Sequence, residues 1–300
     1  MNREYVWFAA GFLAGVLLFG CIFLYRKRKE AVRIQGLIDY LEQVPMGTAS
    51  ILSSFKEDDF SKLEDEIYKT ATFLYQTRDA AVQAKDRFAQ NLSNIAHQIK
   101  TPITSISLSI QMMEQDFDKS RLEQIKRQLL RLSRLEEGLL VLSRLDAGTL
   151  LFQKKETDVF TILVLAADML QELFDGSGTS LDIPELGQMA VMVDPDWTME
   201  AVMNLMKNCM EHHKGGTVHC SYAQNPLYTE ILIRDEGEGF AREDIPHLFE
   251  RFYRGQNAAE GGIGIGLALA KEIVERQNGT IRAKNSPEGG ACFEIRFYSH

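Results

Sequence analysis

The sequence predicts a multidomain protein with an N-terminal transmembrane helix, a helical hairpin that forms a dimeric four-helix bundle, and a C-terminal α/β sandwich. Three patterns lead to this fold class: a charge-free run at residues 6–25, two apolar stripes at helical spacing within residues 87–150, and mixed strand and helix patterns over residues 154–300. A chain of 300 residues that is 45% hydrophobic and 25% charged has room for two globular units and further segments.

Residues 6–25 are the predicted membrane span, because a helix of this length, at about 1.5 Å per residue, covers roughly the 30 Å of a bilayer's hydrocarbon core. The basic cluster from Arg26 to Lys29 follows directly, whereas residues 1–5 carry one basic side chain. The positive-inside rule therefore predicts a single-pass protein of the cell membrane, with residues 1–5 outside and the C-terminal body in the cytoplasm. A cleaved signal peptide is the alternative, which the lack of a small-residue cleavage site before the basic cluster disfavours.

Residues 26–86 are predicted to be a linker that ends in a signalling helix, with an inert spacer as the alternative. Charged, mostly helical patterning runs through them and is interrupted at Pro45 to Gly47. After this break, apolar residues recur at helical spacing up to the next unit.

Residues 87–150 are predicted to form two antiparallel helices. The first apolar stripe consists of Phe88, Leu92, Ile95, Ile99, Ile103, Ile106, Ile110 and Met113, and the second of Leu122, Ile125, Leu129, Leu132, Leu135, Leu139, Leu142 and Leu145. The segment DFDKS separates them, and Gly148 can take the left-handed geometry that ends the second helix. One hairpin cannot bury two full stripes, but two hairpins can, so we expect a homodimer through a four-helix bundle.

From about residue 154 the pattern changes to that of an α/β sandwich, with one mixed sheet and helices on one face. Strands are expected at 189–194, 217–223, 228–235, 280–285 and 291–298, and helices at 157–173, 196–213, 242–251 and 266–277.

Charge and cysteine usage exclude other classes of protein. The formal net charge of −9 argues against direct binding of nucleic acid. The four cysteines, Cys21, Cys209, Cys220 and Cys292, are scattered, so neither a disulfide framework nor a zinc site is expected.

His97 is the candidate nucleophile. It lies two residues from both Ile95 and Ile99, so it points away from the apolar stripe and into solvent. Pro102 cannot donate a hydrogen bond to the carbonyl of Gln98, which predicts a bent or loosened helix beside the imidazole. By position alone, an exposed helical histidine is more often a bystander, so the surrounding motif decides.

That motif, AHQIKTPITSI, resembles the H box of the sensor histidine kinases. The resemblance implies that an imidazole nitrogen of His97 attacks the γ-phosphorus of ATP and forms a phosphoramidate. It also makes Thr101, one helical turn further, a candidate for dephosphorylating the response regulator. Gln98 departs from the family, because most relatives carry an acidic base there. An amide is no base at neutral pH, although it can accept the ring N–H hydrogen bond and set the tautomer.

The segment MNLMKNCMEHH resembles the N box. The resemblance implies that Asn208 holds Mg²⁺ through its amide oxygen, with Asn204 one turn earlier on the same face. Glu211 departs from the basic residue that relatives often carry. His212 and His213 are adjacent and point about 100° apart on a helix, which disfavours a shared zinc ion.

The segment ILIRDEGEGF resembles the G1 box. Asp235 would accept a hydrogen bond from the adenine amino group, and Gly237 and Gly239 would let the backbone turn tightly against the base. Taken alone, this pattern is more often a structural turn.

The segment IPHLFERFYRG resembles the F box. Phe249 and Phe252, three residues apart, would share a face and pack under a lid over ATP. Arg251 and Arg254 are candidate phosphate partners, with solvated roles as the alternative.

The segment GGIGIGLALAKEIVERQNGTI resembles the G2 box, in which Gly262, Gly264 and Gly266 open a helix whose N-terminal amides bind the phosphates. A dinucleotide-binding turn is the alternative for this segment, but it requires a preceding strand, and residues 254–260 read as a loop.

Together the five boxes span about residues 87–298 and imply a Bergerat-type ATP-binding fold. They imply a protein-histidine kinase that uses ATP and Mg²⁺ to phosphorylate His97 and passes the phosphoryl group to an aspartate of a separate response regulator, and that also acts as its phosphatase. Five residues outside the membrane leave no room for a sensor domain, so a membrane sensor or transporter is a candidate partner. Two rivals remain: an ATPase of the same fold, as in type II topoisomerases, which lacks an H box, and a non-enzymatic scaffold or phosphatase, which Gln98 favours.

Overall fold

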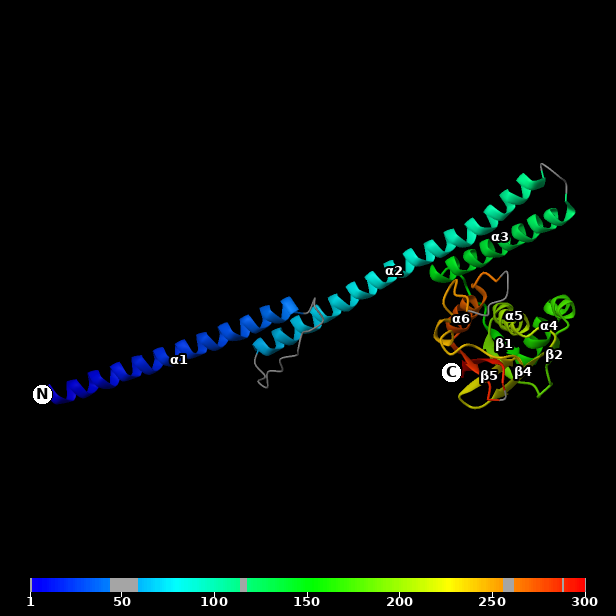
Figure 1. Cartoon of the computed structure of the whole chain (residues 1–300). Coiled ribbons are helices and arrows are strands. Elements are labelled where there is room, and N and C mark those ends of the chain that lie inside the picture. The colour runs from blue at the N-terminus through cyan, green and yellow to red at the C-terminus, as the bar shows by residue number, and fades with distance from the viewer. Residues whose placement is uncertain (1, 44–58, 114–117, 256–261, 288, 300) are drawn as a thin grey trace. The chain divides into compact units, whose positions relative to one another are not determined.

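The computed structural model describes residues 2–43, 59–113, 118–255, 262–287 and 289–299 (Figure 1). The chain divides into two compact units, Met1–Ala89 and Gln90–His300, and each is described by itself. The predicted break at Pro45 to Gly47 lies outside the described residues.

The first unit contains helix α1 (Asn2–Gln43) and the start of helix α2 (Asp59–Met113). Tyr40 of α1 packs edge-on against Tyr68 of α2, with ring centroids 4.2 Å apart, and its hydroxyl lies 3.4 Å from the Thr72 hydroxyl. Among the described residues, no helix combines the length and the apolar character needed to cross a membrane, so the span predicted at residues 6–25 is not confirmed.

The second unit begins with the predicted hairpin, formed by the C-terminal part of α2 and by α3 (Lys119–Asp146). Asp118 caps α3, because its carboxylate accepts a hydrogen bond from the Ser120 amide at 2.8 Å. Gly148 follows the helix with a φ of 64°, as predicted. Helix α2 continues through Pro102, whose side chain is buried.

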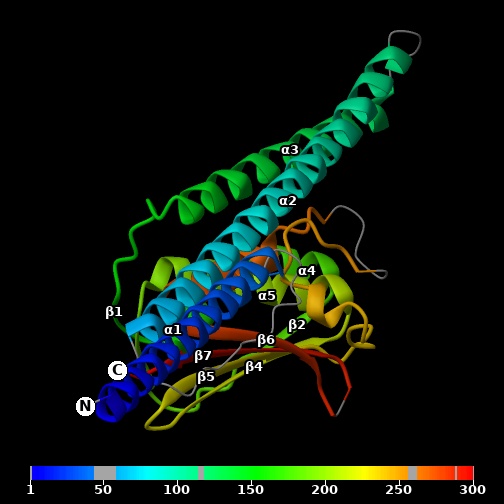
Figure 2. The same cartoon turned by 90° about the vertical axis from the view of Figure 1, so that its left-hand side faces the viewer.

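An α/β sandwich completes this unit and is arranged as predicted, with helices against one face of a mixed sheet (Figure 2). The helices are α4 (Val159–Ser177), α5 (Pro195–His212) and α6 (Gly266–Arg276). The strand order is β2 (Ser180–Asp182), β4 (Thr217–Gln224), β5 (Tyr228–Arg234), β7 (Ala291–Tyr298) and β6 (Gly279–Asn285). Strand β2 runs parallel to β4, and the other neighbours are antiparallel.

The sheet buries one face because its central strands alternate. Every second residue of β5 is buried, among them Ile231 and Ile233, and these side chains join the core with Leu205 of α5 and Ile273 of α6. The opposite face carries ion pairs such as Arg296 with Glu230 at 2.9 Å. This alternation is typical of a sheet that packs one face against a core.

Two details differ from the predictions. The sandwich has a second, two-stranded sheet, in which β1 (Lys155–Asp158) pairs with β3 (Ala190–Val193), so the single predicted sheet was incomplete. The helix predicted at 242–251 is wrong, since only the 3₁₀ helix η2 (Ile245–His247) forms there. Its hydrogen bonds run from residue i+3 to i, for example from the His247 amide to the Asp244 carbonyl at 2.9 Å, and the chain turns away at Phe252, where φ is 67°.

Candidate functional site

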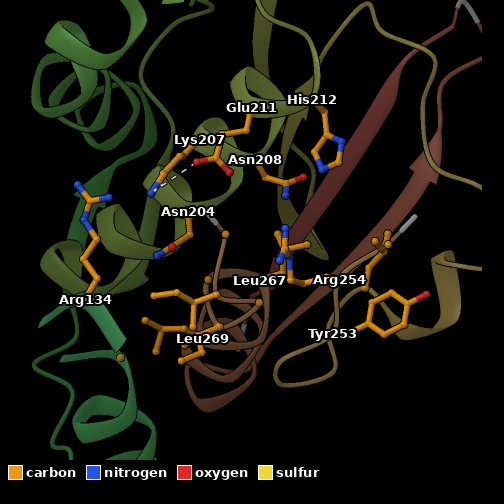
Figure 3. A pocket seen from close by; sticks show the side chains of 18 of the residues that line it. Arg134, Asn204, Lys207, Asn208, Glu211, His212, Tyr253, Arg254, Leu267 and Leu269 are labelled. Atoms are coloured by element: carbon orange, nitrogen blue, oxygen red, sulfur yellow. Dashed lines mark ion pairs between the residues drawn. The ribbon is translucent and has the colours of Figure 1, made fainter. Parts of the chain in front are cut away.

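A cavity of about 1360 Å³ lies among α3, α5, the segment around η2 and the start of α6 (Figure 3). Seven of the predicted nucleotide-binding residues line it: Asn204, Asn208, Gly239, Arg254, Gly262, Gly264 and Gly266. Four others do not: Asp235, Gly237, Phe249 and Phe252. The three residues predicted on the phosphoacceptor helix, His97, Gln98 and Thr101, also lie outside its lining.

Helix α5 brings two amide side chains to the cavity (Figure 3). The Asp194 carboxylate caps this helix by accepting from the amides of Asp196 and Trp197 at 3.1 and 3.2 Å. Asn204 and Asn208 lie one turn apart and therefore share a face, where the amide of Asn204 donates to the Glu200 carbonyl at 2.8 Å.

The amide oxygen of Asn208 is buried and has no hydrogen-bond partner among the described residues. An unpaired buried oxygen costs folding free energy, and a cation that prefers oxygen ligands would satisfy it. Within the part of the chain that the structure describes, no three His, Cys, Asp or Glu side chains cluster to hold a metal. The residues present therefore fit Mg²⁺, which Asn208 would hold through its amide oxygen.

Asp235 follows β5 and is 2% exposed. One carboxylate oxygen accepts from the amides of Gly237 and Ala291 at 2.9 and 3.0 Å, so the backbone fixes the side chain. The other oxygen is buried and, among the described residues, has no partner. It is a fixed acceptor, although the side chain is not part of the cavity's lining.

Gly239 allows a close backbone approach that sequence reasoning only partly explained. Its φ is 79°, and a Cβ there would lie 2.7 Å from the Asn285 amide oxygen. Asn285 clamps the next residue, because it accepts from the Phe240 amide at 2.7 Å and donates to the Phe240 carbonyl at 2.9 Å. Asn285 was missed because an asparagine at the end of a strand carries no signal of such a role.

The glycine-rich segment is built against the chain that precedes it. The Phe252 amide donates to the Gly264 carbonyl at 2.7 Å, and a Cβ on Gly264, whose φ is 78°, would lie 2.7 Å from the Tyr253 carbonyl oxygen. Gly266 begins α6 beside the Asn204 side chain. The N-terminal amides of α6 are therefore next to Asn204 at the cavity wall, where a phosphate can bind.

The two aromatic residues pack differently from the prediction. Phe252 is buried in the core, and the Phe249 ring lies 6.3 Å from that of Phe293. They do not share a helical face, because no helix covers them.

Arg251 does not line the cavity, so its predicted contact with phosphate is not supported. Its guanidinium instead donates two hydrogen bonds of 2.7 Å to the carboxylate of Asp146, at the end of α3. This bond holds the pKa of Asp146 below its ordinary value and raises the pKa of Arg251. Arg254 lines the cavity beside Tyr253, whose bond to Asp244 raises its pKa to about 12.

His97 is exposed on α2, as predicted. The Thr101 hydroxyl donates to the His97 carbonyl at 3.2 Å. The amide oxygen of Gln98 was expected to accept from the His97 ring, but its partner in the described chain is Arg131 of α3, at 3.0 Å.

Helix α3 supplies a wall of the cavity that the sequence reasoning missed. Arg127, Arg131 and Arg134 all line it. Their spacing of four and three residues, which places them on one helical face, was the available signal.

Comparisons with known proteins identify two regions of the chain. Residues 89–148 match the family model of the His Kinase A (phospho-acceptor) domain, and residues 193–299 match that of the histidine kinase-, DNA gyrase B-, and HSP90-like ATPases. The signal transduction histidine-protein kinase BaeS of Escherichia coli (strain K12) is 28% identical over 239 residues, which are 77% of this chain and 51% of BaeS. The sensor protein SphS of Synechococcus elongatus is 32% identical over 222 residues, 68% of this chain and 53% of SphS.

The fold also resembles the histidine kinase ThkA, crystallised in complex with the response regulator protein TrrA. The TM-score is 0.61 at 16% identity, over 76% of this chain and 66% of that one. The chain spans about half the length of the curated relatives described above.

Proposed function

The chain belongs to the sensor histidine kinases of two-component systems, and from this premise we propose that it phosphorylates His97 from ATP and passes the phosphoryl group to an aspartate of a separate response regulator. The observation that carries the proposal is the buried, unpaired amide oxygen of Asn208 in the cavity wall. In a scaffold without activity, no bound ligand would offset the folding free energy that such an unpaired oxygen costs.

Each end of the nucleotide has a partner in this proposal. The unpaired oxygen of Asp235 accepts from the adenine amino group, and Gly239 lets the backbone lie close to the base. The amides at the start of α6 bind the phosphates, and Asn208 holds Mg²⁺, which when bound compensates the charge of the triphosphate.

His97 then acts as the nucleophile. A ring nitrogen forms a bond to the γ-phosphorus as the bond to the bridging oxygen of ADP breaks, and the ring proton passes to solvent. Exposure on α2 suits this histidine, because it must meet first the ATP site and then the response regulator. The complex of ThkA with TrrA supports the choice of such a partner.

Thr101 is the proposed phosphatase residue. Its hydroxyl lies one helical turn from His97 and is exposed. It can position water at the regulator's phospho-aspartate without taking part in the attack on ATP.

A homodimer through the hairpin is part of the proposal. Apolar side chains of the two stripes are exposed in the single chain, among them Leu92, Ile103 and Leu129 at 51%, 49% and 53%. A second copy that packs against them gives a four-helix bundle.

We also propose an organisation along the chain: a membrane anchor at residues 6–25, a linker at 26–86, a dimerisation and phosphotransfer domain at 87–150 and a catalytic domain at 154–300. The anchor rests on the charge-free run that precedes the basic cluster. A membrane sensor or transporter would then be the source of the signal. Carbonate extraction of cells that express the full chain tests the anchor, which requires the chain to stay in the membrane pellet.

Incubation with γ-labelled ATP and Mg²⁺ tests the enzymatic proposal. We expect a label that is labile in acid and stable in alkali, as for a phosphoramidate, and that disappears in His97→Gln. Release of inorganic phosphate without labelling of the protein would instead favour an ATPase.

A further inference from the structure

We propose that Arg131 of α3 is a further catalytic residue, which binds the phosphoryl group while it passes between ATP and His97. The proposal rests on the proposed kinase reaction and concerns the part of that reaction which the nucleotide-binding residues do not reach.

The position of Arg131 joins two sites that are otherwise separate. One guanidinium nitrogen donates to the amide oxygen of Gln98, the neighbour of His97, at 3.0 Å. The same side chain lines the cavity, and the lining also includes Asn208 of α5 and Gly266 at the start of α6. His97 itself does not line that cavity, so Arg131 connects the nucleophile's helix to the place where phosphate binds.

The chemistry of the guanidinium suits this place. It carries five N–H donors in a planar fork, and its bond to Gln98 uses one of them. The remaining geometry matches two oxygens of a phosphoryl group. Arg127 and Arg134 lie on the same face and add positive charge to the wall, but Arg131 is the one of the three whose described hydrogen bond reaches the residue beside His97.

The amide of Gln98 binds Arg131 without neutralising its positive charge. A carboxylate there would form an ion pair with Arg131 and neutralise it, whereas an amide holds the guanidinium and leaves its charge intact. Gln98 is therefore a positioning residue for Arg131. The amide at position 98, where most relatives carry an acidic residue, and Arg131 on the facing helix therefore act together.

In the transfer step, the His97 nitrogen bonds to the γ-phosphorus, and the bond between that phosphorus and the bridging oxygen breaks. ADP leaves with the electron pair, and the imidazole proton goes to water. Negative charge is spread over the three equatorial oxygens in the transition state. Arg131 stabilises that charge from the His97 side, while the amides of α6 act from the nucleotide side.

The test compares Arg131→Gln, Arg131→Lys and the control Arg144→Gln in the full chain. Arg144 lies on the same helix, is exposed and does not line the cavity. Initial rates of His97 labelling at saturating ATP and affinities for a fluorescent ADP analogue are measured. We expect Arg131→Gln to slow labelling by about 10²-fold or more with unchanged ADP affinity, as for loss of one donor to a developing oxyanion. Arg131→Lys should label faster than Arg131→Gln, because it keeps the charge, and Arg144→Gln should match the wild type.

A double-mutant cycle separates catalysis from support of Gln98. If Arg131 only held Gln98, Arg131→Gln would have no further effect in a Gln98→Ala background, and the proposal would fall. We expect a further loss in that background, smaller than the loss in the wild-type background because Gln98→Ala already removes part of the positioning of Arg131. Labelling of Arg131→Gln at the wild-type rate overturns the role of Arg131 and leaves the kinase proposal standing. A wild-type chain that never labels removes both.

Discussion

In the α/β sandwich the polar groups proposed to bind nucleotide are buried and fixed, whereas on the hairpin His97 and Thr101 are exposed to solvent. The carboxylate of Asp235 is held by two backbone amides, and the oxygen of Asn208 is enclosed without a partner. The difference fits the proposed roles, in which the cavity takes one small ligand and His97 meets first the ATP site and then a response regulator. Preorganisation suits the first task, and access suits the second.

Replacement of the buried amide of Asn208 by a hydrocarbon side chain should have the largest effect. Asn208→Leu removes an unpaired buried polar group, so the free energy of unfolding without nucleotide should not fall. Labelling of His97 should fall by about 10²-fold or more, because the proposed ligand of Mg²⁺ is lost. Thermal unfolding and labelling with γ-labelled ATP measure the two effects. A variant that is less stable yet still labels would show that Asn208 is structural.

The backbone around the cavity should be intolerant where the fold brings two segments together. Gly264→Ala puts a Cβ 2.7 Å from the Tyr253 carbonyl oxygen at a positive φ, so we expect a loss of about 2 kcal/mol or more in the free energy of unfolding. Gly176 of α4 is the matched control, since a Cβ there meets nothing within 4 Å. Gly176→Ala should be neutral or slightly stabilising. Equal effects in urea titrations would contradict the close approach.

The ion pair between Asp146 and Arg251 links the end of α3 to the segment after η2 and should matter less. Because Asp146 is half exposed, its removal should change the free energy of unfolding by about 1 kcal/mol or less. Its pKa is lowered by Arg251, so the contribution is present above the ordinary pKa of 3.8 and is lost as the pH falls through the lowered value. Asp146→Asn should therefore lose its difference from the wild type in acid. A difference that grows in acid would exclude this ion pair as its source.

The smallest expected effect comes from His219 on β4, which lies between two carboxylates. Its ring nitrogens are 2.9 Å from Asp182 and 3.0 Å from Glu236, and the hydrogen bond with Glu236 raises its pKa most. The pKa of Glu236 is lowered, chiefly by the same bond. His219 stabilises the fold fully below its ordinary pKa of 6.5, and this stabilisation is lost as the pH rises through its raised pKa in the folded protein. The contribution of Glu236 is fully present only above its ordinary pKa of 4.5 and is lost as the pH falls through its lowered pKa.

We therefore expect His219→Gln to lower the melting temperature slightly between about pH 4.5 and 6.5, and less at alkaline pH. Melting curves over this range measure it. A deficit that is constant with pH would show that the ring acts by packing and not by charge.

The sequence predicted the parts of this molecule that depend on local pattern. The strand patterns of residues 217–223 and 228–235 predicted β4 and β5, and the glycine-rich segment that ends at Gly266 predicted the start of α6. The prediction of a helix at 242–251 was wrong, because the spacing of Phe249 and Phe252 also fits a chain that turns into the core. Local periodicity could not distinguish the two.

Contacts between distant segments were beyond a local pattern. Asn285 clamps Phe240 across 45 residues, and Arg131 reaches Gln98 across 33. The same limit explains Arg251, which looked like a phosphate partner from its motif but binds Asp146 at the end of another element. Only the folded chain brings these pairs together.

The affinity of His97→Gln for nucleotide shows whether buried groups of the sandwich bind ATP while an exposed histidine of the hairpin only accepts the phosphoryl group. A fluorescent ATP analogue is titrated into His97→Gln and, in parallel, into Asp235→Asn. We predict wild-type affinity for His97→Gln, which cannot be labelled, and an affinity about 10- to 100-fold weaker for Asp235→Asn, which loses a charged acceptor. Loss of nucleotide affinity in His97→Gln, or wild-type affinity in Asp235→Asn, would contradict this separation of nucleotide binding from phosphoryl acceptance.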